Sequence, residues 1–352
     1  MFKSVLHEMA STTPTQFWLD SCSQKELAYA LDNGAVGATT NPLIVTAVLE
    51  SELPAYESII KGFVKDMPEA TEDEIAWKTI EYMAIQGAKT LEPIFDPAKG
   101  FGRISIQTNT KYHRNPKLLI EQATYFGTLA PNIQVKLPVT SAGIEAIEEV
   151  TYRGISVNAT VSFTVPQALA VAEAIESGLK RRAAEGLDNT RINPVCTIMG
   201  GRTDDYIKDV AAKKNICIDP GYLEYCGVAV IKNAYRIYQE KGYKTKLLGA
   251  AYRNRHHLAD LIGGDMLHTI PYKYQLYYNA SDIKVCNSMD TPVDPVIVNA
   301  LLEKFDEFKK AYNPDGLSVK EFDNYGATLA TLRGFYAGYD KLVTIIRRFI
   351  VG

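Results

Sequence analysis

The sequence has few cysteines, and none of them is spaced like a zinc ligand. Five thiols occur in 352 residues, at irregular intervals and without a Cys-x-x-Cys pair, which excludes a disulfide framework and a zinc ribbon. The first residues lack an apolar run of signal-peptide length, and no later run approaches the roughly 20 apolar residues of a membrane span. We therefore expect a soluble cytoplasmic protein with reduced thiols.

The sequence also lacks an excess of charge of either sign. Its 38 Lys and Arg against 41 Asp and Glu leave a net charge of -3, so nothing global favours nucleic acid or an anionic membrane. The nucleotide-binding patterns GxGxxG after the first strand and GxxxxGK[ST] are missing. The five histidines form no metal cluster, because His256 and His257 are adjacent and point in different directions while His113 lies in a loop. We expect no metal, and any anionic ligand must be recognised locally.

What the sequence does contain is a regular alternation of short β-branched or apolar runs with longer amphipathic segments. The predicted strands are 17–20, 36–40, 103–108, 133–138, 156–161, 192–198, 246–252 and 266–270. Segments of helical period lie between them, for example 23–34, 116–127, 141–154 and 164–186. Eight strands with helical crossovers predict a parallel sheet in an α/β fold, and eight such units favour a closed (β/α)8 TIM barrel over an open doubly wound sheet.

The whole chain, 1–352, is predicted to form one barrel domain with additional helices. Residues 45–95 hold two helical segments before the third strand, which indicates a helical insertion in the barrel rim. Residues 294–352 are rich in helical sequence and follow no Gly/Ser-rich or Pro-rich linker, so we interpret them as helices appended to the barrel. Either segment could form a subunit interface, and a homo-oligomer is therefore one expectation.

Polar residues at the carboxyl ends of the predicted strands are the candidate site, because chemistry in such barrels takes place there. In strand order they are Asp20; Thr39, Thr40 and Asn41; Gln107 and Asn109; Lys136; Asn158 and Thr160; Thr197 and Arg202; Arg253 and Asn254.

Lys136 is the most unusual of these residues, because it interrupts the apolar run IQVKLP. One interpretation is a wall lysine whose ammonium reaches solvent or a carboxylate. The alternative is a desolvated lysine, whose lowered pKa would leave a neutral amine that can attack a ketone and form a Schiff base.

The other candidates also have two interpretations each. Asp20 could cap the helix beginning near Ser23, with Ser21 as the alternative cap, or it could act as a general acid and base across the barrel mouth. Asn41 could initiate a turn before Pro42 or bind a hydroxyketone. Arg202 and Arg253 could make surface ion pairs or, on adjacent strands, bind a phosphate-like dianion.

Together these residues make the sequence resemble the transaldolase family of class I aldolases, from FWLDS at 17–21 to TIPYK at 269–273. GATTNPLIV (37–45) and IQVKLPVTSAG (133–143) are similar to the two family signatures, and GRIS (102–105), VNATVSF (157–163), GGR (200–202) and AAYRN (250–254) follow in order. The resemblance implies a (β/α)8 barrel and transfer of a dihydroxyacetone unit between sugar phosphates, as in the pentose phosphate pathway. Fructose 6-phosphate would be a donor and erythrose 4-phosphate an acceptor, without a cofactor.

The resemblance also implies a role for each candidate. Lys136 would form the Schiff base and Asp20 would move the proton of the hydroxyl lost in carbon–carbon cleavage. The remaining implied positions are Asn41 and Asn158 for the dihydroxyacetone unit, Thr160 for a catalytic water, Thr39 and Thr197 as further substrate contacts, and Arg202 and Arg253 for the phosphate.

Three positions depart from the family pattern. Gln107 stands where transaldolases carry a glutamate; an amide can orient water but cannot accept its proton. The related fructose-6-phosphate aldolases have this glutamine, but they pair it with a tyrosine where this chain has Met199. Ala251 replaces a serine of the phosphate pocket. These changes leave three alternatives: a lyase that releases dihydroxyacetone, an enzyme acting on another anionic sugar such as a sulfonate, and a sugar-phosphate binding protein without turnover.

Overall fold

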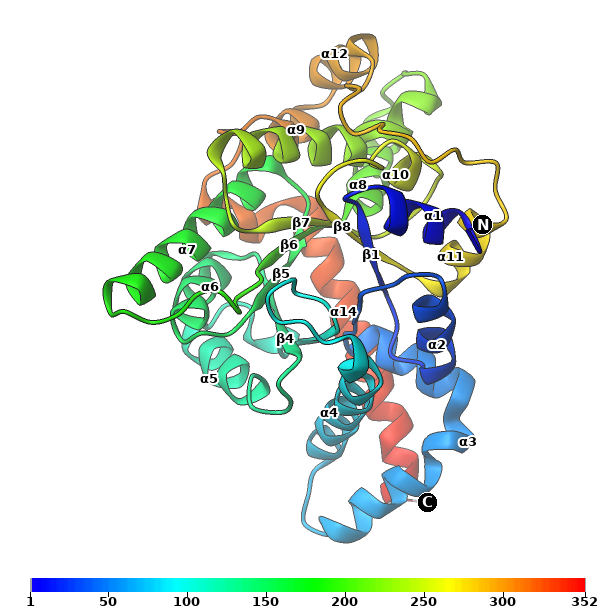
Figure 1. The fold of residues 1–352 in the computed structure, drawn as a ribbon, viewed down its shortest axis with the longest axis vertical. Helices are drawn as coiled ribbons and strands as arrows, with labels where there is room; N and C mark the ends of the chain where they lie inside the picture. Colours follow the sequence, from blue (N-terminus) through cyan, green and yellow to red (C-terminus); the bar gives the residue numbers. More distant parts are fainter. Residues whose placement is uncertain (1, 352) are drawn as a thin grey trace.

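A computed structural model, which describes residues 2–351, shows a closed barrel of eight parallel strands in the order β1 to β8 (Figure 1). The strands are β1 (Gln16–Leu19), β2 (Gly37–Thr39), β3 (Arg103–Gln107), β4 (Ile133–Pro138), β5 (Val157–Ser162), β6 (Val195–Ile198), β7 (Lys246–Gly249) and β8 (Leu267–Ile270). The predicted TIM barrel is therefore confirmed, and the open sheet is wrong because β1 pairs with β8 over its whole length.

The helices surround this barrel and connect its strands. They are α1 (Val5–Thr12), α2 (Gln24–Asp32), α3 (Pro42–Asp66), α4 (Glu72–Leu91), α5 (Pro116–Phe126), α6 (Ser141–Tyr152), α7 (Val165–Ala184), α8 (Gly200–Lys214), α9 (Cys226–Lys241), α10 (His256–Ala259), α11 (Tyr272–Asn279), α12 (Pro295–Lys304), α13 (Asp306–Tyr312) and α14 (Gly326–Ile350). Short 3₁₀ turns lie at η1 (Glu92–Ile94), η2 (Thr110–Tyr112), η3 (Pro220–Tyr225) and η4 (Val319–Asn324). None of the helices in the described part is both long and apolar enough to span a bilayer.

Two strands, β6 and β7, are three residues shorter than the sequence predicts, and backbone chemistry gives the reason. β6 begins at Val195, directly after Pro194, which has no N–H to donate to a neighbouring strand. β7 ends at Gly249 because Ala251 adopts a positive φ of 64°, which an extended strand cannot contain. Both changes leave the strand order intact, and the early end of β7 makes the β7–α10 loop begin at Ala250.

The register of the strands determines which residues share the barrel interior. Gln107 pairs with Lys136, and Lys136 pairs with Asn158 on the next strand. Because paired residues of parallel strands point to the same face, the three polar side chains lie side by side on the inner wall. The pairing of β5 with β6 shifts between Ala159 and Ser162, so β5 contains an irregularity at the residue after Thr160.

The last helix, α14, brings the end of the chain back to the barrel. In Figure 1 it runs in red from the barrel down between α4 and α3 to the C-terminus, and it packs mainly against these two helices. Thr46 on α3 donates a hydrogen bond to the carbonyl of Gly338, and Arg347 forms an ion pair with Glu72 on α4. The predicted insertion (45–95) and the predicted C-terminal helices (294–352) therefore pack against each other.

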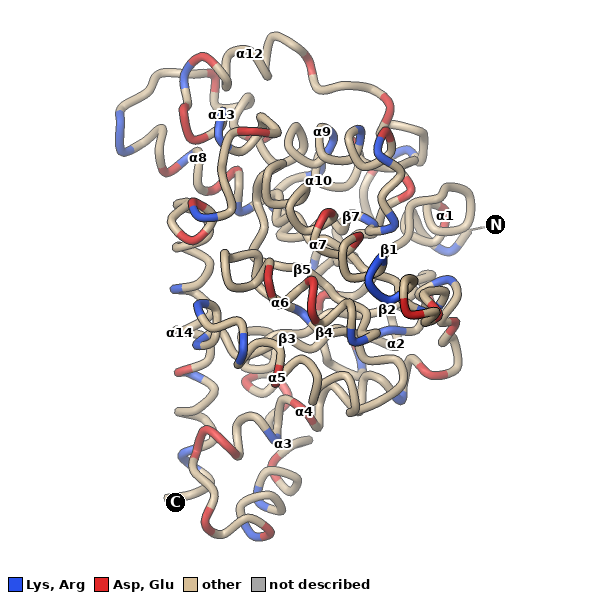
Figure 2. The backbone as a smooth tube through the Cα atoms, turned by 90° about the vertical axis from the view of Figure 1, so that its left-hand side faces the viewer, with Lys and Arg blue, Asp and Glu red and all other residues tan. Residues whose placement is uncertain are grey.

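Charged residues are spread along the whole chain. Figure 2 shows Lys and Arg interspersed with Asp and Glu on helices and loops, without a large area of one sign in that view. Attraction of an anion to this protein must therefore depend on a local group of side chains.

Candidate active site

A cavity of about 320 Å³ lies at the carboxyl ends of the strands. Most of the candidate side chains named from the sequence line it, namely Asp20, Asn41, Lys136, Thr160, Thr197, Arg202 and Arg253. Six other candidates do not line the cavity wall: Thr39, Gln107 and Asn158, which are buried on β2, β3 and β5, and Thr40, Asn109 and Asn254, which lie after the ends of β2, β3 and β7. The strand ends thus bring residues separated by more than 200 positions into one site.

Lys136 on β4 is 4% exposed and reaches the cavity from an apolar strand. Within residues 2–351 its ammonium group makes neither a hydrogen bond nor an ion pair of 4.0 Å or less. Burial lowers the pKa of Lys136, and the negative charge of Asp20 partly opposes this effect. The wall lysine with its ammonium in solvent is therefore the wrong interpretation, and the side chain has the environment of an amine that loses its proton readily.

Asp20 follows β1 and does not cap a helix. The N-cap of α2 is Ser23, whose hydroxyl accepts the backbone N–H of Glu26, so capping by Asp20 or by Ser21 is wrong. Thr39 Oγ1 instead donates to Asp20 Oδ1 at 2.6 Å and accepts from Thr269 Oγ1 at 2.6 Å. Burial raises the pKa of Asp20, while Lys136 and the Thr39 hydrogen bond oppose the rise. Such a carboxyl group keeps its proton to a higher pH than an exposed aspartate does.

Asn158 and Asn41 present oriented amides. Asn158 Oδ1 accepts from Thr197 Oγ1 at 2.7 Å, and its Nδ2 donates to Ser105 Oγ at 3.0 Å. Asn41 caps α3 by accepting the backbone N–H of Ile44 at 2.9 Å, which leaves its Nδ2 as the group available to a ligand. Asn41 can therefore cap α3 with its side-chain oxygen and still present its side-chain nitrogen to the cavity.

Thr160 is held in the cavity by a strained backbone. The next residue, Val161, has a φ of 58°, an unusual value for a β-branched side chain. The strain coincides with the register shift between β5 and β6, and a shift of this kind re-aims the neighbouring side chain. Backbone strain that persists in a buried strand is typical of functional sites.

Gln107 does not extend into the cavity. Its Nε2 lies 3.4 Å from Thr110 Oγ1, a long hydrogen bond, and its buried Oε1 has no partner within the described chain. Met199 lines the cavity at the end of β6. As a result, Asp20 is the only carboxylate among the described residues of the cavity wall.

The opposite side of the cavity is positively charged. Arg202 lies in the first turn of α8, and within residues 2–351 its guanidinium forms no hydrogen bond or ion pair. Burial lowers its pKa, and so does the charge of Arg253. The N-terminus of α8 has no side-chain cap, so its N–H groups add partial positive charge beside Arg202. Two arginines and a helix terminus together form a site for a dianion.

The approach of the β6 and β7 loops requires a glycine. A Cβ atom at Gly201 would lie 1.8 Å from the carbonyl oxygen of Ala251 and 2.8 Å from Cγ of Arg253. Gly201 therefore allows Arg202 and Arg253 to converge on the same part of the cavity.

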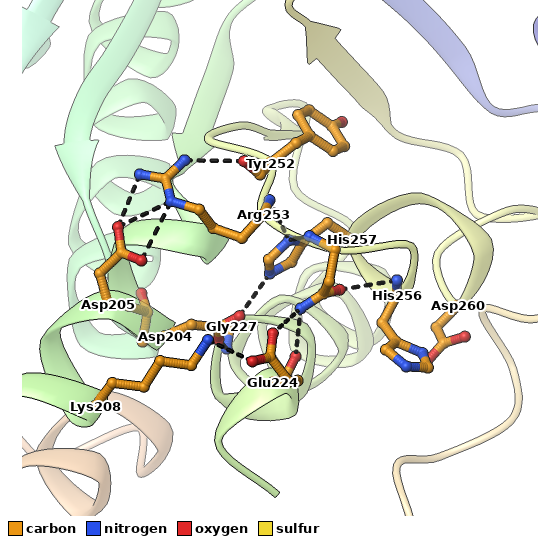
Figure 3. A network of polar contacts seen from close by, with 12 residues as sticks. Asp204, Asp205, Lys208, Glu224, Gly227, Tyr252, Arg253, His256, His257 and Asp260 are labelled. Carbon is orange, nitrogen blue, oxygen red and sulfur yellow. Dashed lines mark hydrogen bonds and ion pairs between the residues drawn. The ribbon is translucent and has the colours of Figure 1, made fainter. Parts of the chain in front are cut away.

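Arg253 is positioned by a network that the sequence did not reveal (Figure 3). Its Nε and Nη2 donate to the carboxylate of Asp205, with a shortest distance of 2.7 Å. His257 Nδ1 accepts the backbone N–H of Arg253 at 3.0 Å, and His257 Nε2 lies 2.9 Å from the buried Asp204, although not aligned as a linear hydrogen bond. Asp204 also accepts the N–H of Gly227. The two adjacent acids after GGRT were the only sequence signal for this support.

Other cavity residues come from elements that the strand-end argument did not include. Lys273 and Tyr274 on α11 line the cavity, and Phe335 reaches it from α14. The guanidinium of Arg202 lies 5.8 Å from the ring centre of Phe335, at a distance that permits a cation–π contact. No sequence motif marks Phe335, because its place depends on how α14 packs against the barrel.

Most of the chain is similar to proteins of one family. Residues 17–314 match the family model for transaldolase/fructose-6-phosphate aldolase. Transaldolase 1 of Streptomyces avermitilis is 29% identical over 242 residues, covering 66% of this chain and 63% of the relative. Transaldolase 2 of the same organism is 32% identical over 199 residues, covering 54% and 53%.

Transaldolase of Acidothermus cellulolyticus is 28% identical over 249 residues, covering 66% of this chain and 63% of the relative. The matched part of the chain thus spans less than two thirds of the length of these three relatives. The family match includes β1 from its second residue, the other seven strands, and the cavity residues from Asp20 to Arg253. The chain therefore belongs to the transaldolase/fructose-6-phosphate aldolase family.

Proposed function

We propose that this protein is a transaldolase-type transferase that moves a three-carbon dihydroxyacetone unit through a Schiff base on Lys136. The observation that carries the proposal is a buried lysine without an ionic partner in residues 2–351, sharing one cavity with a single carboxylate and two arginines. The relatives named transaldolase support this class of reaction for the chain.

The first step needs a neutral amine. Burial disfavours the charged form of Lys136, so its nitrogen can attack the carbonyl carbon of a ketose phosphate such as fructose 6-phosphate. The Asp20 carboxyl group protonates the hydroxyl of the resulting carbinolamine, which leaves as water and gives a protonated imine. The protonated imine serves as the electron sink, and Asp20 is left as a carboxylate. The Nδ2 group of Asn41 can donate to a hydroxyl of the three-carbon unit. Asn158 does not line the cavity and would act through Thr197, whose hydroxyl donates to its Oδ1.

The second step is the cleavage, and we assign its proton transfer to Asp20. Its carboxylate takes the proton of the C4 hydroxyl as the C3–C4 bond breaks, and the bonding electrons pass to the imine to give an enamine. Glyceraldehyde 3-phosphate leaves as the first product. The enamine then attacks the aldehyde of an acceptor such as erythrose 4-phosphate, and Asp20 returns the proton to the new hydroxyl.

Arg202 and Arg253 would bind the phosphate of donor and acceptor in turn. Their side chains converge across Gly201 beside the uncapped N-terminus of α8, which suits a dianion with several acceptor oxygens. Phosphate at this end holds the sugar carbonyl toward Lys136, so the binding energy is used for orientation. A sulfonate has the same oxygen geometry with less charge and is the main alternative group.

A lyase that releases dihydroxyacetone to water is the second candidate, because the fructose-6-phosphate aldolases, which the chain also resembles, have a glutamine at the position of Gln107. An amide at this position can orient a water molecule but cannot remove its proton. The lack of a second carboxylate on the described cavity wall makes hydrolysis of the imine depend on Thr160 and Asp20. Both routes end with hydrolysis of an imine on Lys136, so this feature does not distinguish them. Transfer to an acceptor remains the first proposal because the relatives that the chain resembles are named transaldolase.

The test incubates the protein with fructose 6-phosphate, with and without erythrose 4-phosphate, and measures triose phosphate. Sustained release only with the acceptor supports transfer, whereas sustained release without it supports the lyase. Borohydride added with the donor should leave a mass adduct on Lys136, and Lys136→Met should remove it. If no donor sugar phosphate or sulfonate gives an adduct, the protein is a binding protein and the proposal fails.

A further inference from the structure

A second cavity, of about 300 Å³, lies at the opposite end of the barrel from the candidate active site. Its walls include the first residues of β3 and β4, Arg103 and Ile133, and Ser156 directly before β5. Three arginines line it, Arg103, Arg182 and Arg191. We name this cavity the basal pocket.

Arg103 is the buried member of this group. It is 5% exposed, and its Nη2 donates to the carbonyl of Arg191 at 3.0 Å and to Asn193 Oδ1 at 3.2 Å. Its Nε is buried without a partner in the described chain. Burial and the charge of Arg191 lower the pKa of Arg103 to about 10. Both acceptors are neutral, so the charge of this guanidinium is not compensated.

The other two arginines also lack carboxylate partners. Arg182 donates to the carbonyls of Tyr152 and Asp188 and to Asn189 Oδ1, which are all neutral groups. Arg191 is exposed, and within residues 2–351 its side chain forms no hydrogen bond or ion pair.

The only acid that lines the basal pocket is Asp188, within the described part of the chain. Its two carboxylate oxygens accept from the backbone N–H and the hydroxyl of Thr190, at 2.9 and 2.6 Å. The basal pocket is lined by three guanidinium groups and by one carboxylate, which is already hydrogen-bonded to Thr190. This leaves a surplus of positive charge in a concave, partly apolar space. Such an arrangement costs desolvation energy unless an anion compensates it.

We propose that the basal pocket binds a phosphate monoester of a small molecule, with its phosphate between Arg103 and Arg191. Guanidinium groups bind phosphate through paired N–H donors, and three of them around a cavity focus the field on a dianion. Phe95, Ile133 and Ile155 form an apolar wall next to the arginines and would contact the organic part of the ester. This site is separate from the proposed catalytic arginines and does not depend on the proposed function.

The experiment must first remove the anion site at the other end of the barrel. We would use the full chain carrying Arg202→Gln and Arg253→Gln and titrate it with phenyl phosphate and with inorganic phosphate by calorimetry. One site per chain is expected, and phenyl phosphate should bind more tightly because its ring contacts the apolar wall. No binding to this chain would refute the basal site, and equal or weaker binding of phenyl phosphate would refute the ester.

Two further substitutions in the same chain locate the site. Arg191→Gln should weaken binding about tenfold or more, because one charge-assisted hydrogen bond is lost, and it should not affect folding because the side chain is exposed. Lys180→Gln is the matched control: it removes one exposed positive charge from α7, outside the pocket lining, and should leave affinity unchanged. Unchanged affinity in Arg191→Gln, or an equal loss in both variants, would overturn the proposal.

Discussion

The close approach of the β6 and β7 loops gives the sharpest prediction for the catalytic cavity. Replacing Gly201 with Ala places a Cβ atom 1.8 Å from the carbonyl oxygen of Ala251, whereas ordinary contact begins at 3.4 Å. Both atoms belong to the backbone or are fixed to it, so no side-chain rotation relieves the overlap. One loop must move by roughly 1.5 Å, and it carries Arg202 or Arg253 with it, which costs on the order of 100-fold in kcat/KM for a sugar phosphate.

Overpacking should also lower the free energy of unfolding of Gly201→Ala by about 1–3 kcal/mol. The two effects are measured by steady-state kinetics and by urea unfolding. Gly62→Ala serves as the control, because a Cβ atom at Gly62 in α3 has no neighbour within 4 Å. In that helix position alanine should stabilise by about 0.5–1 kcal/mol and leave kinetics unchanged.

A Gly201→Ala protein with normal kcat/KM and normal stability would refute this reasoning. It would mean that the two loops are free to separate and that the convergence of the two arginines does not depend on contact at this glycine. A loss of stability with unchanged kinetics would support the steric clash at Gly201, but it would contradict the claim that this contact positions the two arginines for phosphate.

Four further predictions concern charge. Lys136→Met should abolish the borohydride adduct. It should also raise the free energy of unfolding at pH 7 by about 1–3 kcal/mol, because burial lowers the pKa of Lys136 in the folded chain and not in the unfolded chain. For the same reason, the free energy of unfolding of the variant should increase less with pH than that of the parent protein. Asp20→Asn removes the charge that raises the Lys136 pKa, so the acid limb of adduct formation should move to lower pH while cleavage is lost; movement to higher pH would contradict it. Asp204→Asn places an amide beside His257 and should cost about 1–3 kcal/mol in urea unfolding; an unchanged midpoint would count against that buried pair. Gln107→Glu should raise the transaldolase rate on ordinary sugar phosphates, and a constant or lower kcat would count against our account of this position.

The barrel and much of the cavity could be predicted from local sequence. Each predicted strand lies within a few residues of an observed one, because β-branched runs and amphipathic segments alternate at a spacing that only parallel β/α units satisfy. Parallel strands end at the same edge, so polar residues at seven strand ends had to converge. Lys136 could be singled out because an ammonium in an apolar strand has few structural explanations.

The sequence could not reveal contacts that depend on how distant elements meet. Ser23 rather than Asp20 caps α2, and only the geometry of the β1–α2 turn distinguishes these neighbours. The positive φ values of Val161 and Ala251 contradict local preference and persist because the surrounding barrel fixes them. The support of Arg253 by Asp205 and His257 likewise requires α8 and the β7–α10 loop to be adjacent.

The alternation of residues along the chain thus determined the strand order, the end of the barrel that carries the cavity, and the buried amine within it. Tertiary structure alone decided that Phe335 from α14 reaches Arg202, and that three arginines far apart in sequence surround a basal pocket. The physical reason is the distance over which each effect acts. Periodicity and capping depend on residues within one or two helical turns along the chain, whereas desolvation and charge depend on every element packed around a group.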